Sequence, residues 1–253
     1  MKTILLFLLC ALPAFGQLTI KNAFYPALVN GVNRSPVPDI FWWRMLEGTG
    51  TTVAGSASSG TDSGNTDAGW STGASSLDYA LDFNGSSHVA SNSTALNFGG
   101  VSSYTIAFWI NPDTTNGGVV LELSTNYNNH AGAFLIYKEN VWMGFTGTSS
   151  GPTYRSETNA PPALGVWTHY LAYFDATAFG DAGNWTVYTN GVLAAMGVRL
   201  TSKATTSAVP TQKAYLGQRG TSATLLLNGK LDDVRIYSGD KTGAVESIYN
   251  DPQ

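Results

Sequence analysis

The sequence contains almost no cysteine. Of its 253 residues only Cys10 carries a thiol, and that residue lies in an apolar N-terminal segment. The rest of the chain therefore has no thiol for a disulfide, a thiolate metal site or a cysteine nucleophile. A stable fold must come from a hydrophobic core, and a chain of this length can build one as a single sandwich or barrel.

Charged side chains are also scarce. They make up 12% of the residues, with 13 basic against 17 acidic side chains and a net charge of −4, whereas globular chains usually carry about 25%. A weakly acidic surface does not attract phosphate groups. We therefore expect neither nucleic acid nor an anionic membrane as a partner.

Long hydrophobic runs are confined to the N-terminus. Lys2 precedes the apolar residues 4–12, and Pro13 and the sequence Ala-Phe-Gly follow. This order is typical of a secretory signal peptide, here over 1–16, and the run is shorter than the roughly 20 residues of a membrane span. We expect a secreted, extracellular protein without membrane insertion, with an uncleaved anchor as the alternative. An extended leader over 17–37 and one domain over 38–253 should follow.

The remaining sequence is rich in Gly, Ser, Thr and Asn, and its strands are short. Residues 77–83 and 104–110 carry large apolar side chains at every second position, as strands with one buried face do, and Asn190-Gly191 predicts a tight hairpin. The spacing predicts an all-β, two-sheet antiparallel sandwich or jelly roll with one short C-terminal helix. Residues 48–76 are mostly small and polar, so we expect a long surface loop there.

Two adjacent acids lie within the strand-like stretch "NGKLDDVRIYSG". Strict alternation would put Asp232 on the apolar face with Val234 and Ile236, and would place Asp233 beside Arg235 as a solvated pair. A buried carboxylate needs a partner. The question is what Asp232 binds.

The order of several motifs resembles one family. "WWRMLEGTGTTVAGS", "ALDFNGSSHV", "YTIAFWINP", "GVWTHYLAYFD", "WTVYTNGVLAA" and "GKLDDVRIYSG" with a terminal "AVESIYN" are similar to the signature strands of the laminin-G-like, concanavalin A-like lectin/glucanase jelly rolls. The resemblance implies that fold. Its members include lectins, carbohydrate-binding modules, adhesion domains, glycanases and polysaccharide lyases, so the activity must be argued from a site.

The same resemblance implies a structural calcium. Many relatives hold one with the aspartate that corresponds to Asp232 and with oxygens from nearby loops, for which Asn84 and a carbonyl near Gly55 are the candidates. Calcium takes six to eight oxygen ligands, carbonyls included. The alternative is that Asp232 only accepts hydrogen bonds from backbone N–H groups.

No catalytic set stands out in the sequence. A retaining glycanase needs two carboxylates about 5 Å apart, but Glu122 stands alone in its strand. The three histidines, His88, His130 and His169, are far apart. His169 fits a structural role in its strand better than a catalytic one. We therefore expect no enzyme.

Five aromatic side chains in or beside polar segments are candidates for stacking against sugar rings, although each could equally anchor a loop: Trp70, Tyr127, Trp142, Tyr154 and Trp185. Together with the export signal they favour a secreted, non-enzymatic domain that binds a polysaccharide or other glycan. The alternative is a structural or adhesion subunit that binds a protein partner or itself, because the leader is too apolar for a free tail. A glycanase or lyase with an unusual site is a weaker alternative.

Overall fold

The computed structural model separates the chain into two compact units, 1–33 and 34–253. It describes residues 28–29, 32–33, 35–57, 60–74, 78–86, 89–91, 103–114, 118–123, 133–137, 140–143, 147–148, 151–152, 154–158, 161–175, 185–200, 214–218 and 225–251. In the first unit the described residues form one small antiparallel pair, β1 (Leu28–Val29) with β2 (Val32–Asn33).

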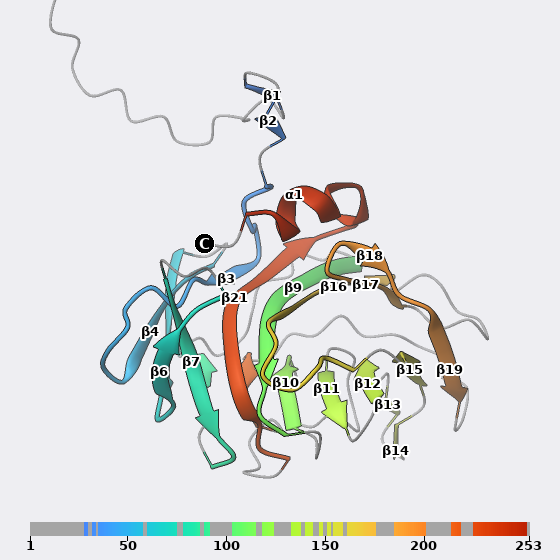
Figure 1. Cartoon of the computed structure of the whole chain (residues 1–253). Coiled ribbons are helices and arrows are strands. Elements are labelled where there is room, and N and C mark those ends of the chain that lie inside the picture. Colours follow the sequence, from blue (N-terminus) through green and yellow to red (C-terminus); the bar gives the residue numbers. More distant parts are fainter. Residues whose placement is uncertain are drawn as a thin grey trace, which may run out of the picture. The chain divides into compact units, whose positions relative to one another are not determined.

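The second unit is a sandwich of two antiparallel layers (Figure 1). The strands of the first layer, in the order in which they pair, are β6 (Gly69–Thr72), β7 (Tyr79–Asn84), β21 (Asn228–Ser238), β9 (Ser103–Pro112), β16 (Thr168–Asp175), β17 (Trp185–Thr189) and β18 (Val192–Leu193). The tight turn at Asn190-Gly191 joins the last two, as predicted, and both turn residues have positive φ.

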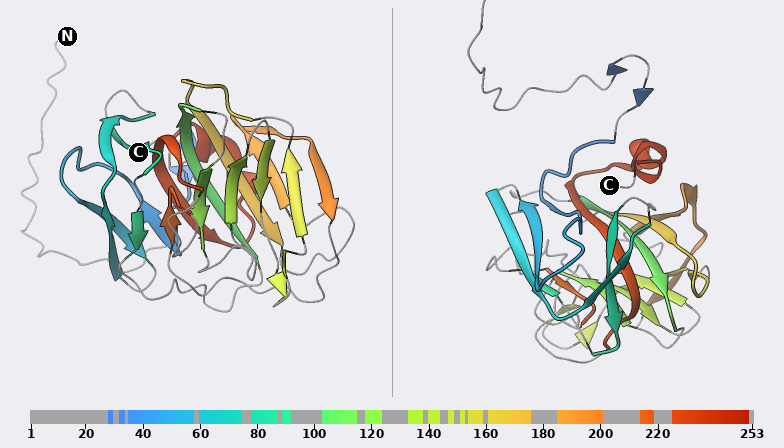
Figure 2. Two further views of the ribbon diagram at one scale, coloured as in Figure 1. Left: turned by 90° about the horizontal axis from the view of Figure 1, so that it is seen from below. Right: turned by 60° about the vertical axis from the view of Figure 1, so that its left-hand side comes forward.

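The second layer is seen from outside in the left view of Figure 2. Its strands, in pairing order, are β5 (Gly60–Thr66), β8 (Val89–Ser91), β20 (Tyr215–Leu216), β10 (Gly118–Glu122), β11 (Ala133–Tyr137), β12 (Asn140–Met143), β15 (Tyr154–Thr158) and β19 (Met196–Leu200). β13 (Gly147–Thr148) and β14 (Gly151–Pro152) form a separate hairpin.

Two strands link the layers along one side. β3 (Phe41–Trp43) pairs with the second half of β21, and β4 (Thr52–Ala57) pairs with both β3 and β5. The prediction of a loop over 48–76 is therefore wrong, because β4, β5 and β6 lie in it. Small residues have weak strand propensity of their own. Here neighbouring strands supply the pairing.

The core lies between the layers. Phe108 and Ile236 of the first layer and Leu121 and Leu216 of the second belong to one buried cluster. Burial of such side chains is the main source of stability in a chain without disulfides. The all-β sandwich is confirmed.

The outer face of the first layer is partly covered by the C-terminal segment. A 3₁₀ turn (Thr242–Ala244) leads into α1 (Val245–Tyr249), the short helix that the sequence predicted. Ile248 packs on Ala107, Leu171 and Tyr237. Within the described residues no helix has the length and hydrophobicity needed to cross a membrane.

Candidate functional site

A β-bulge in β21 separates the two adjacent acids. Asp232 lies opposite Trp109 of β9 and Arg235 opposite Ala107, so Asp233 and Val234 share one position of the partner strand. Asp233 has a φ of 51°, a left-handed conformation that Asp and Asn tolerate better than most residues. The extra residue breaks the alternation.

The bulge overturns the predicted faces. Val234 and Ile236 lie in the core cluster, whereas Asp232 is opposite Trp109, whose ring stacks on Tyr249 of α1 outside the core. The prediction that Asp232 shares a face with Val234 and Ile236 is therefore wrong. Both acids lie on the outer side of the first layer.

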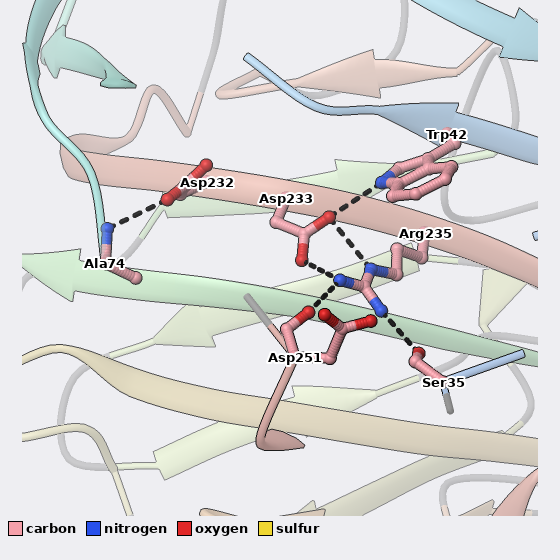
Figure 3. Close-up of polar contacts among 7 residues, drawn as sticks. All are labelled: Ser35, Trp42, Ala74, Asp232, Asp233, Arg235 and Asp251. Atoms are coloured by element: carbon pink, nitrogen blue, oxygen red, sulfur yellow. Dashed lines mark hydrogen bonds and ion pairs between the residues drawn. The ribbon is translucent and has the colours of Figure 1, made fainter. Parts of the chain in front are cut away.

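Asp233 and Arg235 form a buried ion pair (Figure 3). The guanidinium donates from Nε to Oδ1 at 2.8 Å and from an Nη to Oδ2 at 2.5 Å, and the Trp42 indole N–H donates to Oδ1 at 2.7 Å. The exposed fractions are 2% for Asp233 and 1% for Arg235. The pair was predicted correctly, but its placement in solvent is wrong.

Asp232 lies where the neighbour of β21 changes. β7 pairs with β21 up to Leu231, and β3 pairs with it from Val234. Between these, the turn from β6 to β7 approaches, and the Ala74 N–H donates to Oδ2 of Asp232 at 2.8 Å. Asp232 is fully buried, and no described residue donates to its Oδ1. Figure 3 shows its side chain directed to Ala74, away from Arg235.

The electrostatics of Asp232 favour the neutral acid. Burial raises the pKa of Asp232 to about 8, the Ala74 N–H lowers it in part, and the negative charge of Asp78 raises it further. An uncompensated carboxylate here would be costly at neutral pH. A cation at this position would reverse that preference.

Gly73 shows how closely oxygen atoms gather beside Asp232. A Cβ added at Gly73 would lie 2.2 Å from Oδ1 of Asp78, 2.7 Å from Oδ2 of Asp232 and 2.8 Å from the carbonyl oxygen of Tyr79. Oxygens that converge on one point lie close enough for a single calcium ion, with bonds of roughly 2.3–2.6 Å, to touch more than one of them. Two carboxylates and a carbonyl fit calcium as a partial ligand set.

The other predicted calcium ligands are not part of this cluster. Asn84 lies opposite Asn228, four residues along β21 from Asp232, or roughly 13 Å away, and its Oδ1 accepts from the Ser86 N–H. Gly55 pairs with Trp43, which pairs with Val234, so it lies two strands and about 10 Å from β21. Grouping Asn84 and Gly55 with Asp232 is therefore wrong. Sequence reasoning missed Asp78, whose only signal is its position just before β7.

The structure describes the side chains of two of the five aromatic candidates, Trp185 and Trp70. Trp185 is 7% exposed and packs against Tyr104 and Phe174, so its prediction as a surface residue is wrong. Trp185 and Val187 lie two residues apart on one face of β17, and this alternation indicates a buried position. Trp70 is partly buried against the core and donates to the carbonyl of Gly50 at 2.9 Å.

The remaining aromatic candidates lie where side chains are not described. Trp142 is in β12 and Tyr154 in β15, two neighbouring strands of the second layer. Tyr127 falls outside the described residues. That these three residues stack against sugar rings stays a prediction.

His169 lies in a buried aromatic cluster. It is opposite Trp109 on β9, and Trp109 stacks on Tyr249 of α1 with ring centroids 5.4 Å apart. Burial, and then the charge of Arg235, lower the pKa of His169 to about 3. A neutral, 2% exposed imidazole supports the structural role that we expected.

A laminin G family model, described as the concanavalin A-like lectin/glucanases superfamily, matches residues 83–244. The chain belongs to this family. Among curated proteins no sequence matches the chain.

Solved structures share the fold at low sequence identity. The binding domain of botulinum neurotoxin serotype D/C is 14% identical, with a TM-score of 0.59, over 85% of this chain and 52% of that one. The binding domain of botulinum neurotoxin DC, in complex with rat synaptotagmin II, is 14% identical with a TM-score of 0.58, over 85% of this chain and 52% of that one. The third structure is of botulinum neurotoxin type C, a toxin whose cell entry is described as dependent on interaction with two ganglioside molecules. It is 14% identical with a TM-score of 0.57, over 85% of this chain and 51% of that one. This chain thus spans about half of each.

Proposed function

We propose that this protein is a secreted, non-enzymatic recognition domain that binds a glycan. The observation that carries the proposal is the fold, since 85% of the chain matches toxin binding domains, one of them in a structure described by its ganglioside interaction. Fold likeness alone does not fix a ligand. The sequence adds the export signal and the aromatic residues.

The buried acids argue against glycoside hydrolysis at this site. Asp78 and Asp232 approach each other closely, as hydrolase carboxylates do. Asp232, however, is fully buried, and a catalytic acid must reach the glycosidic oxygen. The pair is better suited to a structural role.

Glycan binding is testable with the protein expressed from residue 17. We expect binding on a glycan array or in a polysaccharide pull-down, without release of shorter sugars. Trp142→Ala or Tyr154→Ala should weaken binding, while Leu193→Ala, which alters an exposed residue of β18, should not. Absence of binding to every glycan tested, with and without calcium, would refute the proposal.

We also propose a calcium site whose ligands differ from those that the family resemblance implied. Asp232, Asp78 and the Tyr79 carbonyl would hold the ion, which would supply charge compensation and tie the β6–β7 turn to β21. Binding stabilises the folded state by about 2.7 kcal/mol at a hundredfold excess over Kd. The melting temperature should therefore rise by several degrees in millimolar calcium relative to chelator.

Two substitutions and a control test this set. Asp232→Asn and Asp78→Asn should abolish both the melting shift and the heat of calcium binding in titration calorimetry. Asp113→Asn, at an exposed acid that contacts Lys230, should leave both intact. Equal melting of wild type in calcium and in chelator would show that Asp232 binds no calcium.

A second candidate function is adhesion through a protein partner or a second copy of the chain. It is favoured by the separate N-terminal unit, which carries its own strand pair and could add to a sheet edge. Deleting residues 17–33 should then change the oligomeric state or remove partner binding in sedimentation or pull-down experiments, while glycan binding persists. An unchanged assembly would argue against this function.

A further inference from the structure

One guanidinium touches segments near both ends of the second unit. Arg235 donates from Nη1 to the Ser35 hydroxyl at 2.8 Å and from Nη2 to the backbone carbonyl of Asp251. Ser35 begins the described part of that unit, and Asp251 ends it. Figure 3 shows both reaching the guanidinium from opposite sides, with Asp233 on a third.

These contacts satisfy a charge that is buried. Arg235 is 1% exposed, so an Nη that lost its acceptor would remain in a dry environment, and such losses cost more than the bond itself contributes. Asp233 binds Nε and Nη2, and the Trp42 ring lies 5.2 Å from the guanidinium carbon. The two terminal segments and the Tyr237 hydroxyl, which interacts with both Arg235 and Ser35, complete the shell.

Each segment also has an independent anchor, which limits what Arg235 controls. On the N-terminal side, the Asp39 carboxylate accepts from the Ser238 N–H at 2.7 Å. On the C-terminal side, Ile248 is buried against β9 and β16. Loss of the Arg235 contacts should therefore free only residues 35–38 and 250–251.

We propose that Arg235 is a clasp that couples these two segments, so that displacement of one weakens the hold on the other. Release of Asp251 lets the guanidinium move and water enter, and Ser35 then loses a rigid, desolvated partner. The reverse follows by reciprocity of coupling. The coupling between residues 35–38 and 250–251 thus passes through the Arg235 guanidinium and needs no ligand.

The Arg34–Ser35 bond provides a readout, because trypsin cleaves after arginine. Inserting Gly-Gly between Asn250 and Asp251 moves the carbonyl away from Arg235. We expect trypsin cleavage at Arg34–Ser35, followed by mass spectrometry, to accelerate about threefold or more, given typical coupling energies between groups in contact. In an Arg235→Lys background the same insertion should add no acceleration.

The reciprocal experiment perturbs the other segment. In the protein expressed from residue 17, Ser35→Ala should increase the mobility of a spin label at the exposed position Asn250→Cys. This measurement serves as the test of the proposal if Arg235→Lys does not fold. Lys230→Met, which breaks an exposed ion pair on the same strand, serves as the control and should change neither readout. Unchanged cleavage after the insertion, or equal acceleration with Arg235→Lys, would overturn the clasp.

Discussion

Two aspartates joined by one peptide bond have opposite surroundings. Asp233 faces the guanidinium of Arg235 and the Trp42 indole, whereas Asp232 faces a second carboxylate, that of Asp78, and the backbone N–H of Ala74. Their exposed fractions are nearly equal, 2% and 0%. Burial therefore does not decide whether an acid stabilises this fold. What decides is the charge of the groups that neighbouring strands and turns place beside the acid.

The bulge creates the difference. It turns Asp233 toward β3, which contributes Trp42, and leaves Asp232 beside the β6–β7 turn, which contributes Asp78 and Gly73. One region is a completed ion pair. The other is a cluster of oxygens around a buried carboxyl group, and it is the place at which we propose calcium.

The largest effect is expected from a substitution that breaks the ion pair of Asp233 and Arg235. Asp233→Asn keeps a residue that tolerates positive φ but leaves the buried Arg235 without its counter-charge, and losing one partner of a buried pair costs about 3–5 kcal/mol. The free energy of unfolding, measured by urea denaturation, should fall by that amount.

The same substitution at the neighbouring residue, Asp232, should raise the stability instead of lowering it. Burial raises the pKa of Asp232 to about 8, so at pH 8 in chelator the folded chain either holds a proton that the unfolded chain has lost or buries a charge. Asp232→Asn removes this cost, and the free energy of unfolding should rise by about 1 kcal/mol or more. If both variants lose stability equally, the two environments do not differ as described.

A third substitution tests the crowding around Asp232. Gly73→Ala would place a methyl group against Asp78, Asp232 and the Tyr79 carbonyl, and overpacking of this kind costs about 1–3 kcal/mol. Calcium binding should be lost as well. Gly243→Ala is the matched control, because nothing lies within 4 Å of its added Cβ. Comparable destabilisation by both changes would contradict the cluster.

The pH dependence sharpens the comparison. Between pH 6.5 and 8 the folded chain keeps a proton on Asp232 that the unfolded chain has lost, so stability in chelator should fall by about 2 kcal/mol across this window. Below pH 6.5 the unfolded chain gains a proton at His169 that the folded chain rejects until about pH 3, and the two slopes oppose each other. Thermal melts should show the fall in wild type and none with Asp232→Asn or with bound calcium.

The smallest effect concerns the exposed ion pair on the same strand. Lys230 and Asp113 lie 3.3 Å apart with side chains 25% and 41% exposed. Such pairs contribute about 0–1 kcal/mol, so Lys230→Met should barely change the urea midpoint. A loss comparable to that of Asp233→Asn would mean that burial matters less than we infer.

The strands and the sandwich were predictable because large apolar side chains recur at every second position in strands such as "SYTIAFWINP". The site was not. A bulge that depends on a non-glycine residue with positive φ leaves no mark in the alternation rule, and its omission moved Asp232 to the wrong face. Asp78 lies 154 residues before Asp232, so its proximity depends on sheet topology. Trp185 was misread for a simpler reason, since the polar loop before it outweighed its alternation with Val187.

The position of β21 also bears on how the fold can form. This strand lies in the middle of the first layer, between β9 on one side and β7 and β3 on the other, and its contact from Asp233 to Trp42 spans 191 residues. Pairings over such separations close slowly, because the chain entropy is lost before the contact is gained. A chain extended only to residue 227 would hold β3, β7 and β9 without the strand that joins them. Assembly of the first layer therefore waits for the same twelve-residue stretch that carries both aspartates, "NGKLDDVRIYSG".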